Sequence, residues 1–238
     1  MRTLVLLGSG EFTKAMEEAD KYLLSIAPGN IITILPTAAG QETDFHKWID
    51  DGLNHFKKLG ASPIGVPIIK REDTQKKDFL NKIRESSVIY FSGGDPGYLH
   101  STLDNSPLWK SVLSKYENGT MLAGSSAGAM IMGHYVLANA KSVYLEDKEP
   151  IWTKAFGLIP FSIVPHYDAV ETEKPGFTKR AMESAHSKIR DNWIGIDEDT
   201  AMIISDENSV RVVGKGKVNI FKNKSEFNYS SGNQFNLS

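Results

Sequence analysis

Residues 90–132 decide the fold, and they read YFSGGDPGYLHSTLDNSPLWKSVLSKYENGTMLAGSSAGAMIM. Two apolar runs, at 88–91 and 120–123, each end in a turn rich in glycine. Such a run is typical of a buried strand that leads into a turn. The second turn, at 124–128, fits G-x-S-x-G, a pattern that places a serine on a sharp strand-to-helix turn with its hydroxyl above the sheet.

Apolar runs and helical patterns alternate through the first half of the chain. Strand patterns at 3–7, 31–35 and 62–69 are separated by helical patterns at 12–26 and 43–59. Strands and helices that alternate at short spacing favour parallel strands joined by right-handed crossovers. We therefore expect an α/β fold, a three-layer sandwich around a mostly parallel sheet of the flavodoxin-like kind.

The last part of the chain has shorter elements. Strand patterns separated by hairpin-length gaps lie at 193–196, 201–204, 210–213 and 218–221. They predict an antiparallel margin near the C-terminus. Because no internal repeat or linker interrupts the sequence, we expect residues 1–238 to form a single domain.

The composition argues against several classes of protein. A formal net charge of −2 gives no reason to expect nucleic acid or an anionic membrane as a partner. The absence of cysteine excludes disulfides, thiolate metal ligands and a cysteine nucleophile. No apolar run approaches the roughly 18 residues of a membrane span, and the apolar run at the N-terminus is shorter than the core of a signal peptide. We therefore expect a cytoplasmic protein.

Ser126 is the candidate nucleophile, because it stands at the centre of the G-x-S-x-G turn with a strand pattern before it and a helical pattern after it. A serine hydroxyl needs a base to act near neutral pH. Five of the six histidines fall within or beside helical patterns, but His166 follows the apolar run at 161–164. A residue just past the carboxyl end of a parallel strand lies at the same rim as the serine turn, so we expect His166 to be the base.

A third group should orient the imidazole, and the sequence leaves three carboxylates open for this role. Asp147 and Glu149 lie between the serine and the histidine, whereas Asp168 lies two residues beyond the histidine. The oxyanion of an acyl-transfer intermediate also needs backbone donors. We expect these from the N–H of Ala127, next to the nucleophile, and the N–H of Gly94, in the first glycine-rich turn.

Three motifs together, FSGGD at 91–95, GSSAGA at 124–129 and PHY at 165–167, resemble the dipeptidase E and cyanophycinase family of serine peptidases. The similarity spans roughly residues 4–204. The fold of that family is similar to that of the class I glutamine amidotransferases, which use cysteine at the serine's position, so glutaminase chemistry by that route is ruled out here. The resemblance implies Ser126 as nucleophile and His166 as base, with no metal or cofactor.

The resemblance also bears on the third member of the triad and on the substrate. It implies an acid near residues 147–149, where Asp147 and Glu149 rank about equally and Asp168 remains a rival. Dipeptidase E cleaves after an N-terminal aspartate, recognised partly by an arginine beyond the histidine, and Arg180 stands at the matching separation. A guanidinium suits this task because its fork binds both oxygens of a carboxylate.

Asp95 departs from the dipeptidase E pattern, which has asparagine at this place. A carboxylate there would repel an acidic substrate side chain. Cyanophycinase can have aspartate at this position, but it carries longer surrounding segments that this chain lacks.

We therefore expect a serine exopeptidase of the dipeptidase E type that hydrolyses short peptides, with N-terminal aspartate as one candidate specificity. We expect it to act as a monomer or homodimer. The alternatives are a cyanophycinase-like enzyme, an esterase or amidase of the α/β-hydrolase type, and an inactive member of the fold that binds a small molecule. The α/β-hydrolase type would need an N-terminal antiparallel meander and a His-Gly motif, and the sequence shows neither.

Overall fold

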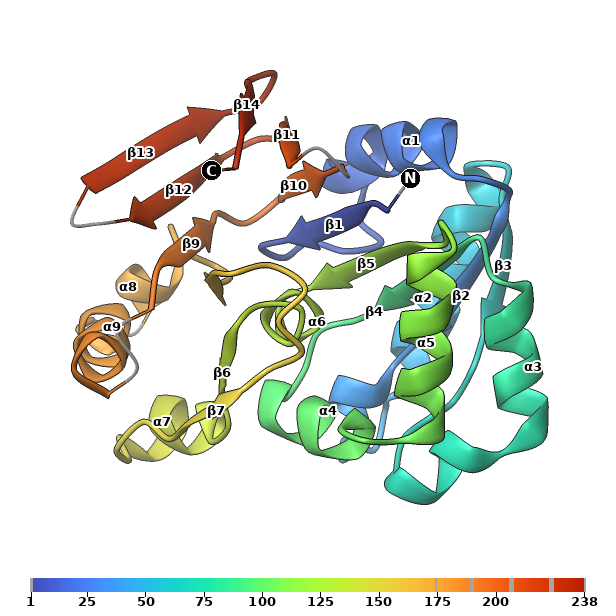
Figure 1. Ribbon diagram of the computed structural model, residues 1–238, viewed down its shortest axis with the longest axis horizontal. Coiled ribbons are helices and arrows are strands. Elements are labelled where there is room, and N and C mark those ends of the chain that lie inside the picture. The colour runs from blue at the N-terminus through green and yellow to red at the C-terminus, as the bar shows by residue number, and fades with distance from the viewer. Residues whose placement is uncertain (1, 174, 189–190, 206–207, 223–224, 238) are drawn as a thin grey trace.

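The computed structural model describes residues 2–173, 175–188, 191–205, 208–222 and 225–237. An eight-stranded sheet runs through the molecule, with strand order β14-β11-β10-β1-β5-β4-β2-β3 (Figure 1). Its strands are β1 (Leu4–Leu7), β2 (Ile31–Leu35), β3 (Ser62–Gly65), β4 (Val88–Phe91), β5 (Met121–Ser125), β10 (Thr200–Ile204), β11 (Ser209–Gly214) and β14 (Gln234–Asn236).

The strands of the first half of the chain, β1 to β5, are parallel, and the C-terminal strands extend the sheet in antiparallel fashion from β1. Strand β1 pairs with β5 in parallel and with β10 in antiparallel orientation. Strands β11 and β14 follow beyond β10, each antiparallel to its neighbour. The structure therefore confirms the expected α/β class, with a mostly parallel central sheet and antiparallel strands from the C-terminal part.

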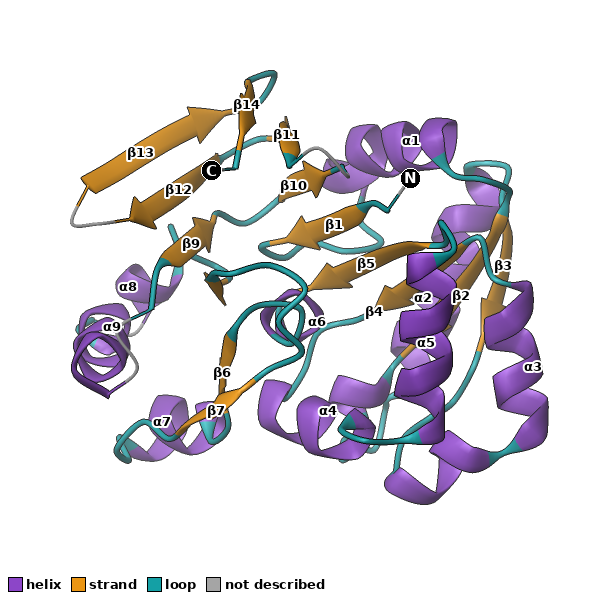
Figure 2. Ribbon diagram, in the orientation of Figure 1, coloured by secondary structure: helices purple, strands orange, loops and turns teal. Residues whose placement is uncertain are grey.

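Helices cover both faces of this sheet (Figure 2). Helices α1 (Glu17–Ile26) and α2 (His46–Lys58) pack on one face. The other face is covered by α3 (Lys77–Glu85), α4 (Pro96–Leu103), α5 (Pro107–Glu117) and α6 (Ala127–Met130). Short 3₁₀ turns lie at Lys14–Met16, Thr37–Ala39 and Arg71–Gln75.

Strand β4 shows why the apolar runs of the sequence are continuous. Val88 and Tyr90 pack with the α1 and α2 side of the core, whereas Ile89 and Phe91 pack on the opposite side. Successive side chains of a strand point to opposite faces, so a strand covered on both faces is apolar at every position.

A second sheet lies beside the central one, with strand order β13-β12-β9-β8. Its strands are β8 (Ser162–Val164), β9 (Trp193–Ile196), β12 (Lys217–Lys222) and β13 (Ser225–Ser230). The sequence predicted one antiparallel margin, and the structure divides those strands between two sheets. The chain leaves β9 in the second sheet and enters β10 in the central sheet through residues 197–199 (Figure 1).

The remaining elements follow α6 in the chain, and the first of them contacts both strand β8 of the second sheet and helix α4 over the central sheet. They are the paired strands β6 (Tyr135–Leu137) and β7 (Trp152–Lys154) and the helices α7 (Ala140–Glu146), α8 (Val170–Glu173) and α9 (Phe177–Lys188). In the part of the chain that the structure describes, no helix combines the length and the apolar character needed to cross a membrane.

Candidate active site

Ser126 occupies a strained turn between β5 and α6. Its backbone angles are φ 50° and ψ −111°, a conformation that non-glycine residues rarely adopt. Two glycines let the turn pack closely: a β-carbon on Gly124 would lie 2.4 Å from the carbonyl carbon of Gly128, and one on Gly128 would lie 2.4 Å from the carbonyl oxygen of Phe91. The G-x-S-x-G pattern thus forms the strand–turn–helix that the sequence predicted.

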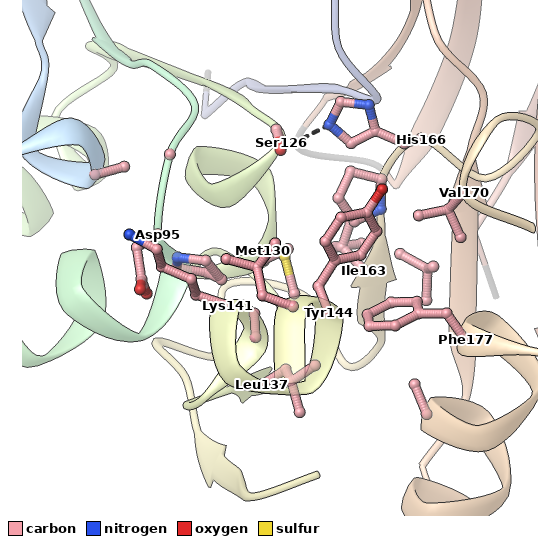
Figure 3. A pocket seen from close by; sticks show the side chains of 18 of the residues that line it. Asp95, Ser126, Met130, Leu137, Lys141, Tyr144, Ile163, His166, Val170 and Phe177 are labelled. Carbon is pink, nitrogen blue, oxygen red and sulfur yellow. Dashed lines mark hydrogen bonds between the residues drawn. The ribbon is translucent and has the colours of Figure 1, made fainter. Parts of the chain in front are cut away.

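The imidazole of His166 lies against the hydroxyl of Ser126. Its Nε2 is 2.9 Å from Ser126 Oγ, although the two residues are 40 positions apart in the chain (Figure 3). His166 follows strand β8, and its backbone also has a positive φ, of 52°. The expected position beside the serine is confirmed, although the reason differs from the one that the sequence suggested: β8 lies in the second sheet and not in the parallel sheet that carries Ser126.

The carboxylate beside His166 belongs to Glu198. Its Oε1 is 2.7 Å from His166 Nδ1. An ionised carboxylate only accepts hydrogen bonds, so Nδ1–H donates to Glu198 and Nε2 is left to accept from the hydroxyl of Ser126. This chain of two hydrogen bonds has the order that a serine nucleophile, its base and an orienting acid require.

Asp168 holds the backbone of Glu198. Its Oδ1 accepts a hydrogen bond from the N–H of Glu198 at 2.8 Å. Asp168 was one of the carboxylates that the sequence left open for contact with the imidazole. In the structure, Asp168 hydrogen-bonds to the backbone of Glu198, and Glu198 is the residue that contacts the imidazole.

Asp147 and Glu149, the two acids that the resemblance favoured, lie elsewhere. Asp147 follows helix α7 and its Oδ1 is 3.2 Å from Arg180 Nη2, with the aspartate side chain 63 % exposed. Glu149 is exposed, and its backbone carbonyl accepts a hydrogen bond from Asn139. The structure gives His166 the carboxylate of Glu198 instead, because the connection from β9 to β10 passes the imidazole.

A signal for Glu198 was present in the sequence. It stands two residues after the strand pattern at 193–196, so the rule that selected His166 also applies to it. The sequence favoured acids that lie between the serine and the histidine in the chain, and Glu198 lies outside that interval. In the structure the acid comes after the histidine.

The two glycine-rich turns lie against each other at Ser126. A β-carbon on Gly93 would lie 3.5 Å from Ser126 Cβ, so the first turn packs against the nucleophile. Ala127 begins α6, where the N–H has no partner within its own helix. Among the described residues, the N–H groups of Ala127 and Gly94 donate to no other group, whereas the N–H of Gly93 donates to Glu11 Oε1 at 2.8 Å.

Glu11, in the loop after β1, is a site residue that the sequence analysis did not identify. Besides Gly93, its carboxylate accepts a hydrogen bond from the hydroxyl of Ser125. No motif of the sequence marks it, because its two partners lie 82 and 114 positions away in the chain.

Ser126 and His166 open into a cavity of about 440 Å³. Gly94 and Asp95 also line it, and Asp95 in addition caps helix α4 by accepting a hydrogen bond from the N–H of Tyr98 at 2.9 Å. The guanidinium of Arg180 is not part of the cavity lining. It donates to the carbonyl of Val143 at 3.3 Å in addition to its ion pair with Asp147.

Comparison with known proteins places this site in a family. The sequence model of peptidase family S51 matches residues 4–212. The crystal structure of a peptidase from an acI-B1 Actinobacterium has a TM-score of 0.87 and 33 % identity, and the match covers 100 % of this chain and 97 % of that one. A cyanophycinase from Geminocystis herdmanii is 28 % identical over 193 residues, which are 80 % of this chain and 68 % of the cyanophycinase.

A more distant structure has the same fold. The crystal structure of a putative peptidase E protein from Listeria monocytogenes has a TM-score of 0.62 and 20 % identity, and the match covers 90 % of this chain and 98 % of that one. These similarities confirm the resemblance to the dipeptidase E and cyanophycinase family. Because the family model covers most of the sequence, the chain belongs to peptidase family S51 and is a serine peptidase.

Proposed function

We propose that the protein is a serine exopeptidase that hydrolyses short peptides through Ser126, His166 and Glu198. One observation carries the proposal: the hydrogen bonds from Ser126 to His166, at 2.9 Å, and from His166 to Glu198, at 2.7 Å, are continuous. The cavity of about 440 Å³ has the volume of a site for a small ligand, which favours short peptides over folded proteins.

In the proposed mechanism, Ser126 Oγ attacks the carbonyl carbon of the scissile peptide bond while His166 Nε2 takes its proton. Glu198 stabilises the imidazolium that forms. The N–H groups of Gly94 and Ala127 bind the oxyanion. His166 then gives the proton to the leaving amine as the C–N bond breaks. Water, deprotonated by His166, hydrolyses the acyl-enzyme and releases Ser126.

The roles of Asp147, Glu149 and Arg180 change in this proposal. Glu198 takes the position that the resemblance assigned to Asp147 or Glu149, and Asp168 supports it. We do not include Arg180 among the residues that bind substrate, because its guanidinium is already paired with Asp147 and the carbonyl of Val143.

A fluorophosphonate probe tests the nucleophile directly. We expect it to label the wild-type protein at Ser126 and not to label Ser126→Ala, and we expect hydrolysis of a mixed dipeptide library to disappear in the same variant. Ser114→Ala is the matched control, since Ser114 lies on α5, outside the cavity lining. Turnover that persists in Ser126→Ala would exclude the mechanism, and a wild-type protein that takes no label would favour an inactive, ligand-binding member of the fold.

A second candidate function, cyanophycinase activity, is favoured by the names of several curated relatives. Release of soluble products from purified cyanophycin would identify it, and hydrolysis of p-nitrophenyl esters without peptide hydrolysis would identify an esterase.

Our proposal also includes a cytoplasmic location, a single domain and a monomer or homodimer. Cell fractionation, limited proteolysis and light scattering, respectively, test these three points.

A further inference from the structure

The walls of the cavity next to Ser126 are mainly apolar. Side chains from six elements converge there, as Figure 3 shows. They are Met130 of α6, Leu137 of β6, Tyr144 of α7, Ile163 of β8, Val170 of α8 and Phe177 of α9. A wall of this kind contributes binding energy by taking apolar surface out of water. Its Tyr144 carries a hydroxyl, which donates to Glu173 Oε2 at 3.3 Å.

The position of Ser126 decides which part of a substrate meets these walls. Ser126 and His166 line the same cavity as the apolar side chains. The residue whose carbonyl is attacked stays attached to the serine through both steps of the reaction, whereas the leaving amine departs after the first. The proposed reaction thus gives the acyl-side residue the longer stay beside Ser126, and on this ground its side chain is assigned to the cavity.

Charge around the cavity does not suit an acidic side chain. Among the residues that the structure describes, three carboxylates, those of Glu42, Asp95 and Glu173, line it against one ammonium, that of Lys141. Lys141, Glu42 and Glu173 are all exposed, so water and salt screen their charges alike, and Asp95 is the one of the four that is half-buried. An N-terminal ammonium is favoured by this balance, and a substrate aspartate is disfavoured.

The same carboxylates do not form a binding site for arginine. Glu42 and Glu173 are exposed, and Asp95 is engaged as the cap of α4. Among the residues described, those that form the apolar walls include no carboxylate. Glu173 reaches the walls through the hydroxyl of Tyr144, which donates to its Oε2 at 3.3 Å, so this carboxylate is already engaged and a guanidinium would have to compete with that hydrogen bond.

We infer that the cavity selects peptides whose N-terminal residue has a large apolar side chain, of the leucine or phenylalanine class, over peptides that begin with aspartate or arginine. The inference rests on the proposed function for its assignment of the acyl side. It concerns binding, however, and binding can be measured without turnover.

Dipeptide binding to Ser126→Ala tests the inference. The peptides are Phe-Ala, Leu-Ala, Asp-Ala and Arg-Ala, which differ only in the N-terminal residue, and titration calorimetry gives each Kd. Trp152 and Trp193, which also line the cavity with ring centroids 5.3 Å apart, provide a second readout by fluorescence. We expect Phe-Ala and Leu-Ala to bind at least tenfold more tightly than the other two. Equal affinities, tighter binding of Asp-Ala or Arg-Ala, or no binding of any peptide would overturn the inference.

A matched pair of variants tests whether the apolar wall is responsible. Phe177 lines the cavity, whereas Phe227 on β13 is 49 % exposed and lies outside the lining. In the Ser126→Ala background, Phe177→Ala should raise the Kd of Phe-Ala at least fivefold and leave that of Asp-Ala unchanged, and Phe227→Ala should change neither. An unchanged Kd for Phe-Ala in a folded Phe177→Ala protein would contradict the inference. Should that variant not fold, the four-peptide series decides alone.

The two proposals fail in different ways. If the wild-type protein neither takes the fluorophosphonate label nor hydrolyses any peptide, the proposed function is wrong, and the binding series still decides the chemistry of the cavity. If it is labelled but prefers Asp-Ala or Arg-Ala, the peptidase mechanism stands and the apolar specificity is wrong.

Discussion

Glu11 accepts a hydrogen bond from the hydroxyl of Ser125, the residue before the proposed nucleophile, at 2.5 Å. The other oxygen of the same carboxylate accepts from the N–H of Gly93 at 2.8 Å. Glu11 follows β1, Ser125 ends β5 and Gly93 follows β4, and these strands are neighbours in the sheet. The carboxylate of Glu11, in the loop after β1, therefore connects the turn that carries Ser126 to the turn that carries Gly93 and Gly94.

We expect Glu11→Ala to lower kcat by about tenfold to a hundredfold with little change in KM, because displaced oxyanion donors weaken stabilisation of the transition state. Glu11→Gln should recover part of the loss, since its amide oxygen can still accept from Gly93. Glu17→Ala, which removes only an exposed ion pair with Lys21, is the control. Steady-state kinetics check this prediction, and a rise in KM at constant kcat would contradict a positioning role for Glu11.

Removing the carboxylate charge at position 198 should make the imidazole of His166 a weaker base for Ser126. Glu198→Gln leaves a side chain of the same size but no longer stabilises an imidazolium, so kcat should fall roughly a hundredfold or more. Glu149→Gln, a change at an exposed side chain, should leave kcat unchanged. The opposite pattern, a large loss in Glu149→Gln and a small one in Glu198→Gln, would restore the acid that the resemblance favoured.

Asp168 should affect the reaction through the backbone of Glu198. Asp168→Ala removes the acceptor of that N–H, which frees the segment that carries Glu198, and we expect kcat to fall by about tenfold. Asp168→Asn keeps an acceptor oxygen and should retain most of the activity. Equal losses in the two variants would mean that the charge of Asp168, and not its hydrogen bond, is what matters.

Gly94 should be more sensitive to alanine than another glycine with positive φ. At Gly94, φ is +136° and a β-carbon would lie 2.5 Å from the carbonyl carbon of Ala38. Strain and overpacking together should cost roughly 3 kcal/mol of the free energy of unfolding and most of the activity. At Gly60, φ is +87° and nothing lies within 4 Å of that position, so Gly60→Ala should cost only about 1 kcal/mol and leave activity unchanged. Denaturant unfolding and kinetics of both variants give the comparison, and equal costs would contradict it.

His100 should make the fold sensitive to mild acid. Partial burial lowers the pKa of His100 below its usual value, and the charge of Asp104 opposes this only in part. The unfolded chain then binds the proton more readily than the folded one, so the free energy of unfolding should fall as the pH drops below about 6.5. His100→Gln should flatten this dependence between pH 7 and 5. A slope that is the same in both proteins would show that His100 is not its source.

Much of the site followed from local patterns in the sequence. The glycine-rich turn around Ser126 and the apolar run before His166 each encode their own strand. The sequence suggested one parallel sheet for both strands, but β5 lies in the central sheet and β8 in the second, and the packing of the two sheets brings the strand ends together. The fold class followed from the same alternation of strands and helices. The catalytic roles of Ser126 and His166 stay predictions until the variants are measured.

Other features depend on how distant segments meet. The sequence showed the strand pattern at 193–196 but not that the chain changes sheets directly after it, which is what carries Glu198 to the imidazole. Arg180 matched the spacing of a substrate-binding arginine, yet the ion pair with Asp147 is decided by how α7 and α9 pack. Glu11 contacts only residues far away in the sequence, so no local pattern could reveal it.

The passage of the chain from the second sheet to the central sheet also determines when a newly synthesised chain can bring Ser126, His166 and Glu198 together. Ser126 follows a strand of the central sheet, His166 follows a strand of the second sheet, and Glu198 lies between the two. A polypeptide emerging from the ribosome therefore presents its serine long before the groups that would activate it. Peptide hydrolysis should begin only after both sheets have docked, so premature or truncated chains stay latent toward the peptides around them.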